Sequence, residues 1–225
     1  MKISGSGTLS EGKINDDLQV SGSAKLKGNF ECNGFNSSGS LRGEGNLMVH
    51  GDIKNSGSFR LMGNVYGDGN MKSSGSTSIE GEVLIKGKLN SSGSFRTGKK
   101  TEGAQGIKIS GSSHINGDLL SQDSIILTGS ATIHGNVIGN DIIIGHEPRL
   151  SIGVYKHPNK IYGNISSRNN VEITKTLVEG DVKGLTVKIG RGSEIIGIVY
   201  YVDEIEVSKK TILANEPIKI SREEL

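Results

Sequence analysis

Five histidines carry the side chains best suited to acid–base or metal chemistry in this 225-residue chain, and their spacing supports neither role. They are His50, His114, His134, His146 and His157. The two that are nearest in sequence lie eleven residues apart, which is not a known spacing of metal ligands. His114 precedes Ile115 and His134 follows Ile133, so strand alternation predicts that both imidazoles point outward. We therefore expect no catalytic and no metal site.

Cys32 is the only cysteine, so no intramolecular disulfide can form. We expect its thiol to be a neutral group rather than a nucleophile. The chain lacks the GGxGxD run of calcium-binding β-rolls, and none of its glycine pairs leads into a helix that begins with Lys-Ser or Lys-Thr, as a phosphate loop would. The sequence thus predicts no cofactor and no enzymatic activity.

One segment gathers polar side chains that could bind a partner. The stretch between Gly135 and Gly163 is longer than one repeat, and the excess lies near 146–160, where Pro148 and Pro158 interrupt the pattern. We expect a protruding loop there. Its candidate partner-binding residues are His146, Arg149, Tyr155, Lys156 and His157. An inert insertion is the alternative interpretation.

The elements that would position these residues are indicated by a periodic series of glycines. Ten glycines recur at an interval of six residues: Gly39, Gly45, Gly51, Gly57, Gly63, Gly69, Gly75, Gly81, Gly87 and Gly93. A fixed period of this kind is typical of a solenoid. Glycine suits the bends of such a fold because a Cβ atom would obstruct close approaches there.

A longer repeat, of roughly 17 to 18 residues, contains three of these six-residue units. It is marked by Ser-Gly-Ser or a close variant, centred on Gly5, Gly22, Gly39, Gly57, Gly75, Gly93, Gly111 and Gly129. Three short strands separated by bends predict one triangular turn of an all-β parallel β-helix. We expect one domain over 1–225, with a weak turn near 97–106 and a short charged end at 221–225.

Two aliphatic columns are expected to form the core, because residues two apart in a strand face the same side. One contains Leu26, Leu61, Ile79, Ile115, Ile133, Ile161, Val178 and Ile195. The other contains Phe30, Leu47, Val65, Val83, Leu119, Val137, Ile165, Val182 and Val199. The serines on either side of the repeated glycines should form an exposed double hydroxyl ladder. Either these small hydroxyl residues suit the bend, or the ladder offers a flat, uncharged face on which a second rod or a regular surface can pack closely.

Composition excludes several classes of function. The chain has 26 basic and 24 acidic residues, a net charge of +2 without long runs, so no nucleic-acid partner is expected. No segment approaches the roughly 18 continuous apolar residues that a membrane span needs. The opening MKISGSGTLSEG enters the repeat at once without a secretion signal. We expect a cytoplasmic location.

The run Ile109 to Gly145, ISGSSHINGDLLSQDSIILTGSATIHGNVIGNDIIIG, followed by IYGNI and VEGDV, resembles the bactofilins, the polymer-forming cytoskeletal proteins of bacteria. The shared pattern is aliphatic-x-Gly-Asp/Asn-aliphatic at the interval of the longer repeat, best matched over 107–202. The resemblance implies a right-handed β-helix that polymerises end to end without nucleotide into a scaffold, in filaments without polarity. It implies that the partners are other copies of this chain, paralogous bactofilins and client proteins. The chain lacks the family's N-terminal membrane-binding stretch, so we expect no direct membrane binding.

The candidate polymerisation residues lie at the two ends of the repeat. At the N-terminus they are Ile3 and Leu9, whose turn has no preceding cap. At the C-terminus they are Ile212, Leu213, Ile218 and Ile220, where Pro217 interrupts the pattern and a cap is also conceivable. We expect exposed strand edges at these ends to bind another copy.

Three other classes of protein share parts of this pattern. A hexapeptide-repeat acyltransferase also has six-residue units, but its glycine directly follows the aliphatic residue, whereas here one residue intervenes. An ice- or carbohydrate-binding β-solenoid could use the serine ladder. A polysaccharide-cleaving β-helix would need clustered outward carboxylates and basic residues, and we expect the serine face to lack both.

Overall fold

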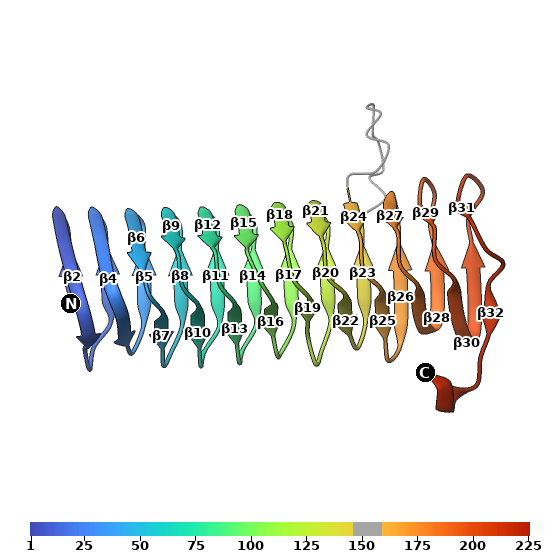
Figure 1. Cartoon of the computed structure of the whole chain (residues 1–225), viewed down its shortest axis with the longest axis horizontal. Helices are drawn as coiled ribbons and strands as arrows, with labels where there is room; N and C mark the ends of the chain where they lie inside the picture. Colours follow the sequence, from blue (N-terminus) through green and yellow to red (C-terminus); the bar gives the residue numbers. More distant parts are fainter. Residues whose placement is uncertain (146–158) are drawn as a thin grey trace.

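The computed structural model describes residues 1–145 and 159–225 and shows a parallel β-solenoid of about 11 turns. The turns are stacked into a rod with the termini at opposite ends (Figure 1). Each turn has three short strands, and each strand pairs in parallel with the equivalent strand of the next turn. The all-β parallel fold predicted from the glycine period is therefore confirmed.

Three faces run along the rod, and their strands follow each other in the chain in the order of faces 2, 3 and 1. Face 1 contains β1 Lys2–Ile3, β3 Leu18–Val20, β5 Phe35–Ser37, β8 Ile53–Asn55, β11 Met71–Ser73, β14 Leu89–Ser91, β17 Ile107–Ile109, β20 Ile125–Leu127, β23 Ile142–Ile144, β26 Asn170–Ile173 and the second parts of β28 Val182–Ile189 and β30 Val199–Val207. Face 2 contains β2 Ser6–Lys13, β4 Ser23–Cys32, β6 Ser40–Glu44, β9 Ser58–Leu61, β12 Ser76–Ile79, β15 Ser94–Thr97, β18 Ser112–Ile115, β21 Ser130–Ile133, β24 Asn159–Ile161, β27 Thr176–Val178, β29 Glu194–Ile195 and β31 Ile212–Leu213. Face 3 contains the ends of β2 and β4, the first parts of β28 and β30, and β7 Leu47–Val49, β10 Val65–Gly67, β13 Val83–Ile85, β16 Thr101–Gly103, β19 Leu119–Leu120, β22 Val137–Gly139, β25 Ile165–Ser167 and β32 Ile218–Lys219. A short 3-10 helix, η1 Arg222–Glu224, follows β32.

Both predicted aliphatic columns are present in the core. In the first, on face 2, Leu61 pairs with Ile79, and Ile133 pairs with Ile161. In the second, on face 3, Val65 lies between Leu47 and Val83. Ile133 and Ile161 are further apart in sequence than one repeat and still pair directly, so the extra residues after Gly145 are an insertion between adjacent turns.

Face 1 supplies a third buried column in addition to the two predicted ones. Its members are Leu18, Phe35, Ile53, Met71, Leu89, Ile107, Ile125, Ile142, Val171 and Val187. The Phe35 ring packs 5.1 Å from the Phe59 ring of face 2. The interior is thus filled from all three faces, which closes the triangular cross-section.

The turn near 97–106 keeps the register of its neighbours. Thr97 and Thr101 are buried in the two columns where aliphatic residues stand in other turns. Their hydroxyl oxygens lie 2.8 Å apart, and the Thr97 hydroxyl donates to the carbonyl oxygen of Lys99. Because both hydroxyls are hydrogen-bonded, burying them costs less than burying unpaired hydroxyls would.

The glycine after each Ser at the corner between faces 1 and 2 is required by the stacking of the turns. A Cβ atom added to Gly75 would overlap the carbonyl oxygen of Gly57 in the preceding turn, and Gly93 stands in the same relation to Gly75. The flanking serines are exposed or half-buried, as the alternation predicted. The serine triplets therefore mark a corner where consecutive backbones touch.

At the corner between faces 2 and 3, the Asn or Asp that follows the glycine links neighbouring turns. Its side-chain oxygen accepts the backbone N–H of the equivalent residue one turn later, at 2.7 to 2.9 Å. One run joins Asn29, Asn46, Asn64 and Glu82, and a second joins Asp118, Asn136, Asn164, Asp181 and Ile198. The repeated Gly-Asn/Asp pair thus satisfies a backbone donor that the bend would otherwise leave unpaired.

Candidate functional site: the two ends of the solenoid

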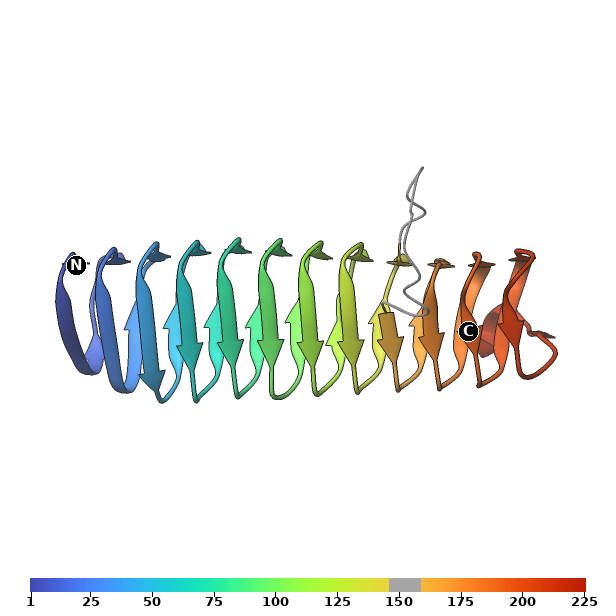
Figure 2. The same ribbon diagram turned by 90° about the horizontal axis from the view of Figure 1, so that it is seen from above.

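The N-terminal end presents an unpaired edge of the sheet. Among the described residues, β1 pairs only with β3, and β2 pairs only with β4 and lies at the end of the rod (Figures 1 and 2). Of the two residues predicted here, Ile3 is half-buried, and Leu9 is 6% exposed and packs on Leu26. Ile3 therefore presents apolar surface at this end, whereas Leu9 belongs mainly to the core of the first turn.

The N-terminal charge is held beside the same end. The Met1 ammonium lies 3.1 Å from Asp16 Oδ2 and donates to the carbonyl oxygen of Asp17 at 2.6 Å. The pKa of Asp16 is lowered, first by the hydrogen bond from the Asp17 backbone N–H and then by the ammonium group. These contacts hold Met1 beside Asp16 and Asp17, so that Met1 does not cover Ile3.

The C-terminal end places its four predicted residues in two different environments. Leu213 is half-buried and continues an interior column by pairing with Ile195. Ile212 and Ile218 are 57% and 44% exposed, and their pairing with Glu194 and Tyr200 places them on the outside of faces 2 and 3.

Ile220 is half-buried and lies away from the open end. It lines a hollow of about 420 Å³ on face 3 together with Lys183, Tyr200 and Glu224. Of the four predicted residues at this end, only Leu213 therefore faces the axial cross-section.

The C-terminal segment folds back along the side of the rod (Figure 1). The Lys183 ammonium group donates to the carbonyl oxygen of Glu224, and Arg222 Nη2 lies 3.5 Å from Asp203 Oδ2. In the described part of the chain, no helix or strand crosses either end of the stack (Figures 1 and 2). Both ends therefore offer backbone groups and apolar side chains to another molecule.

Two interior columns begin and end in aliphatic residues. The column that starts at Leu9 ends at Leu213, and the column that starts at Ile3 and Val20 ends at Val207. If a second copy followed on the same axis, aliphatic side chains would meet aliphatic side chains in both columns. The two ends are thus compatible with continued stacking.

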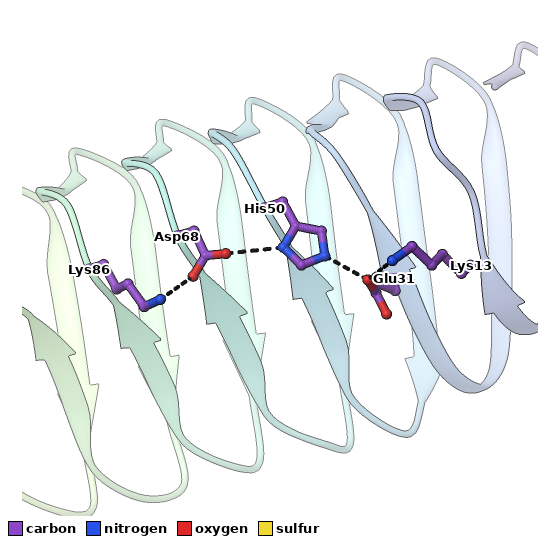
Figure 3. A network of polar contacts seen from close by, with 5 residues as sticks. All are labelled: Lys13, Glu31, His50, Asp68 and Lys86. Atoms are coloured by element: carbon purple, nitrogen blue, oxygen red, sulfur yellow. Dashed lines mark hydrogen bonds and ion pairs between the residues drawn. The ribbon is translucent and has the colours of Figure 1, made fainter.

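A chain of ion pairs runs across five successive turns near the N-terminal end (Figure 3). Glu31 Oε1 lies 2.6 Å from both Lys13 Nζ and His50 Nε2. Asp68 accepts on the other side, with Oδ2 3.0 Å from His50 Nδ1 and Oδ1 2.8 Å from Lys86 Nζ. The sequence signal for it is the regular spacing of His50, Asp68 and Lys86 at the interval of the longer repeat, which the sequence analysis did not use.

Within this chain of ion pairs, the stabilising charge of His50 and those of Glu31 and Asp68 are lost in opposite directions of pH. The hydrogen bonds with Glu31 and Asp68 raise the pKa of His50 above 6.5, so its contribution to stability is complete below pH 6.5 and is lost as the pH rises through the raised pKa. The hydrogen bond with His50 lowers the pKa of Glu31 below 4.5. The hydrogen bond with Lys86 lowers the pKa of Asp68 below 3.8. The contribution of these two carboxylates to stability is complete above their ordinary pKa values, and it is lost as the pH falls through their lowered pKa values. All three groups therefore stabilise the turns together between about pH 4.5 and 6.5.

Two other histidines lie on the outside of face 2, as strand alternation predicted. The ring centroids of His114 and His134 are 5.3 Å apart, and His134 stacks on Tyr162 at 4.6 Å. No group of three or more His, Cys, Asp or Glu side chains that could hold a metal ion occurs within 1–145 and 159–225.

The predicted loop residues His146, Arg149, Tyr155, Lys156 and His157 lie outside the described residues. Within the described part of the chain, no helix is both long and apolar enough to cross a membrane. Comparisons with protein-family models, with curated proteins and with solved structures found no match.

Proposed function

We propose that this chain is a structural protein that assembles end to end, without a nucleotide, into filaments that act as a scaffold for other proteins. A β-solenoid is consistent with a structural or repeat-type role. The sheet edges at both ends have no partner within the described residues, and such edges pair readily with further strands.

The observation that carries the proposal is the empty space at Gly5. At the equivalent glycines the missing Cβ atom makes room for the preceding turn, as Gly75 does for Gly57. Around Gly5 no atom lies within 4 Å of the position that a Cβ would take. The first turn thus keeps the serine-glycine corner although nothing in the described chain requires it, and a neighbouring molecule at this end would fill that space.

The interior columns support the same proposal. A joint at these ends buries Ile3 and Leu213, both of which are only half-buried in the single chain. Burying apolar surface favours association by roughly 25 cal/mol per Å². The resemblance of 109–145 to the bactofilins, which rests on the repeated Gly-Asp/Asn pattern, favours a polymer-forming role for this chain too.

The experiment uses three single variants, Ile3→Lys, Leu213→Lys and Gly5→Ala, with Ile143→Lys as the control. Ile143 is exposed on the side of the rod, so the control adds the same charge away from the ends. Negative-stain electron microscopy without nucleotide should show filaments for the unmodified chain and for the control.

The three end variants should give single rods that retain the circular dichroism spectrum of the unmodified chain. Filaments of unchanged length in all three variants would refute joining through these ends.

A further inference from the structure

Face 2 carries a column of cations on its outer surface. Its outward positions pair in the order Lys25, Arg42, Arg60, Ser78 and Arg96, one residue per turn. Successive paired strands lie roughly 4.8 Å apart, so the cations form a straight line along the rod. Ser78 interrupts the line and leaves a gap between Arg60 and Arg96.

These cations are largely free of internal partners. Lys25, Arg42 and Arg96 are exposed and form no ion pair with the described residues. Arg60 is 63% exposed, and its Nη2 lies 3.9 Å from Glu80 Oε1, a distance at the limit of an ion pair. The four cations face two carboxylates, Glu44 and Glu80, so the column keeps an excess of positive charge, which attracts a linear anion.

Three hollows lie beside this column, and Arg42 lines all of them. The first is about 640 Å³ and is lined by Ser6, Gly7, Thr8, Ser23, Ala24, Lys25, Ser40 and Arg42. The second is about 460 Å³, lies at the Ser78 gap, and is lined by Arg42, Ser58, Phe59, Arg60, Ser76, Thr77, Ser78, Glu80, Ser94, Arg96, Gly98 and Asn116. The third is about 270 Å³ and is lined by Lys25, Arg42, Gly43, Glu44, Arg60 and Met62. Because the three hollows share Arg42, they form one shallow groove whose lining includes serine hydroxyls and guanidinium groups.

The chemistry of the groove selects among linear anions. Its lining is dominated by donors, namely guanidinium, ammonium and hydroxyl groups; of its two carboxylates, Glu80 lies beside Arg60 and Glu44 lines the hollow of Lys25 and Arg42. Phe59, the aromatic residue of the lining, is buried, so the groove gives bases and sugar rings no aromatic surface on which to stack. The apolar residue Ala24 is buried as well. Met62 is 66% exposed beside Arg60, but one methionine offers little of the apolar surface that inserts into a lipid layer.

From these observations we infer that the groove of face 2 binds inorganic polyphosphate, a linear anion whose surface consists of hydrogen-bond acceptors. Arg60 and Arg96 hold phosphate groups through paired N–H donors. The serine hydroxyls donate to the phosphate oxygens between them. The groove lies on the side of the rod, so this inference does not depend on joining at the ends.

The test measures binding of long-chain polyphosphate by isothermal titration calorimetry. The double variant Arg60→Gln, Arg96→Gln should weaken binding at least about tenfold, because charge-assisted hydrogen bonds are lost. The control is Lys54→Gln, Lys72→Gln, which removes the same charge from the neighbouring face 1. Its affinity should stay within about twofold of the unmodified chain.

Single-stranded oligothymidylate and polygalacturonate serve as competing probes at equal charge. Both should bind more weakly than polyphosphate. Equal weakening by the two double variants, equal affinity for either competing probe, or no saturable binding of polyphosphate would each overturn the inference. Thermal unfolding of both double variants checks that they are folded.

Discussion

Replacing Gly75 by alanine should destabilise the rod, whereas the same change at Gly5 should not. At Gly75 the new Cβ would overlap the carbonyl oxygen of Gly57 and lie 2.6 Å from the carbonyl carbon of Ser56. Carbon atoms in contact normally lie about 3.5 to 4.0 Å apart, so the two turns must separate by roughly 1 Å. This displacement weakens the 2.9 Å hydrogen bond from Ser76 N–H to the Gly57 carbonyl oxygen.

The size of the effect follows from three terms. Overpacking costs about 1 to 3 kcal/mol, and a weakened backbone hydrogen bond costs about 1 kcal/mol. The loss of unfolded-state entropy on replacing glycine returns about 0.4 to 1 kcal/mol. The free energy of unfolding should therefore fall by about 1 to 3.5 kcal/mol for Gly75→Ala. For Gly5→Ala only the last term applies, so its stability should be unchanged or slightly higher.

The assay is urea unfolding followed by far-ultraviolet circular dichroism, at concentrations where sedimentation shows single chains. The midpoint for Gly75→Ala should lie clearly below that of the unmodified chain, and the midpoint for Gly5→Ala should not. Equal midpoints for both variants would show that the turns are not in close contact at this corner, and the argument from Gly5 would then fail as well.

Three further predictions concern single side chains. His50→Gln should lower the melting temperature at pH 5.5 and have no effect well above the raised pKa of His50, because the protonated ring is the stabilising form; a loss that is equal at both pH values would contradict this. Asp118→Ala should cost about 1 kcal/mol in urea unfolding, because its Oδ1 accepts a backbone N–H, whereas Asp118→Asn keeps an acceptor and most of the stability. Burial raises the pKa of the Cys32 thiol to about 11, so Ellman's reagent should label the chain at pH 7.5 only after unfolding, and rapid labelling of the folded chain would be inconsistent with a buried thiol.

The fold could be predicted because, over 39–93, each corner of the rod places a glycine against the preceding turn. That steric requirement repeats with the turn, so Gly57, Gly75 and Gly93 record it directly in the sequence. The third core column was not predicted, although two of its members, Ile53 in VHGDI and Leu89 in IKGKL, end the same aliphatic-x-Gly-x-aliphatic motif. Phe35 does not end such a motif, and the next inward position in the strands of Phe35 and Ile53 is polar, as at Asn55.

The candidate sites depend on which charged side chains share a column, and the repeat interval was applied only to the aliphatic and serine positions. Lys13 and Glu31 are ordinary surface charges until pairing places them beside His50. Arg60 and Arg96 are distant in sequence and become neighbours across Ser78 only when the turns are stacked. Gly5 and Gly75 are the central residues of two copies of the same Ser-Gly-Ser triplet. The structure alone shows that Gly75 is crowded by the preceding turn and that Gly5 faces open space.

The most direct test of the proposed assembly is the length distribution of the purified, unmodified chain, measured by negative-stain electron microscopy over a range of protein concentrations without nucleotide. End-to-end joining predicts rods of constant width whose lengths are multiples of the single chain and grow with concentration. A single rod length at all concentrations would contradict it.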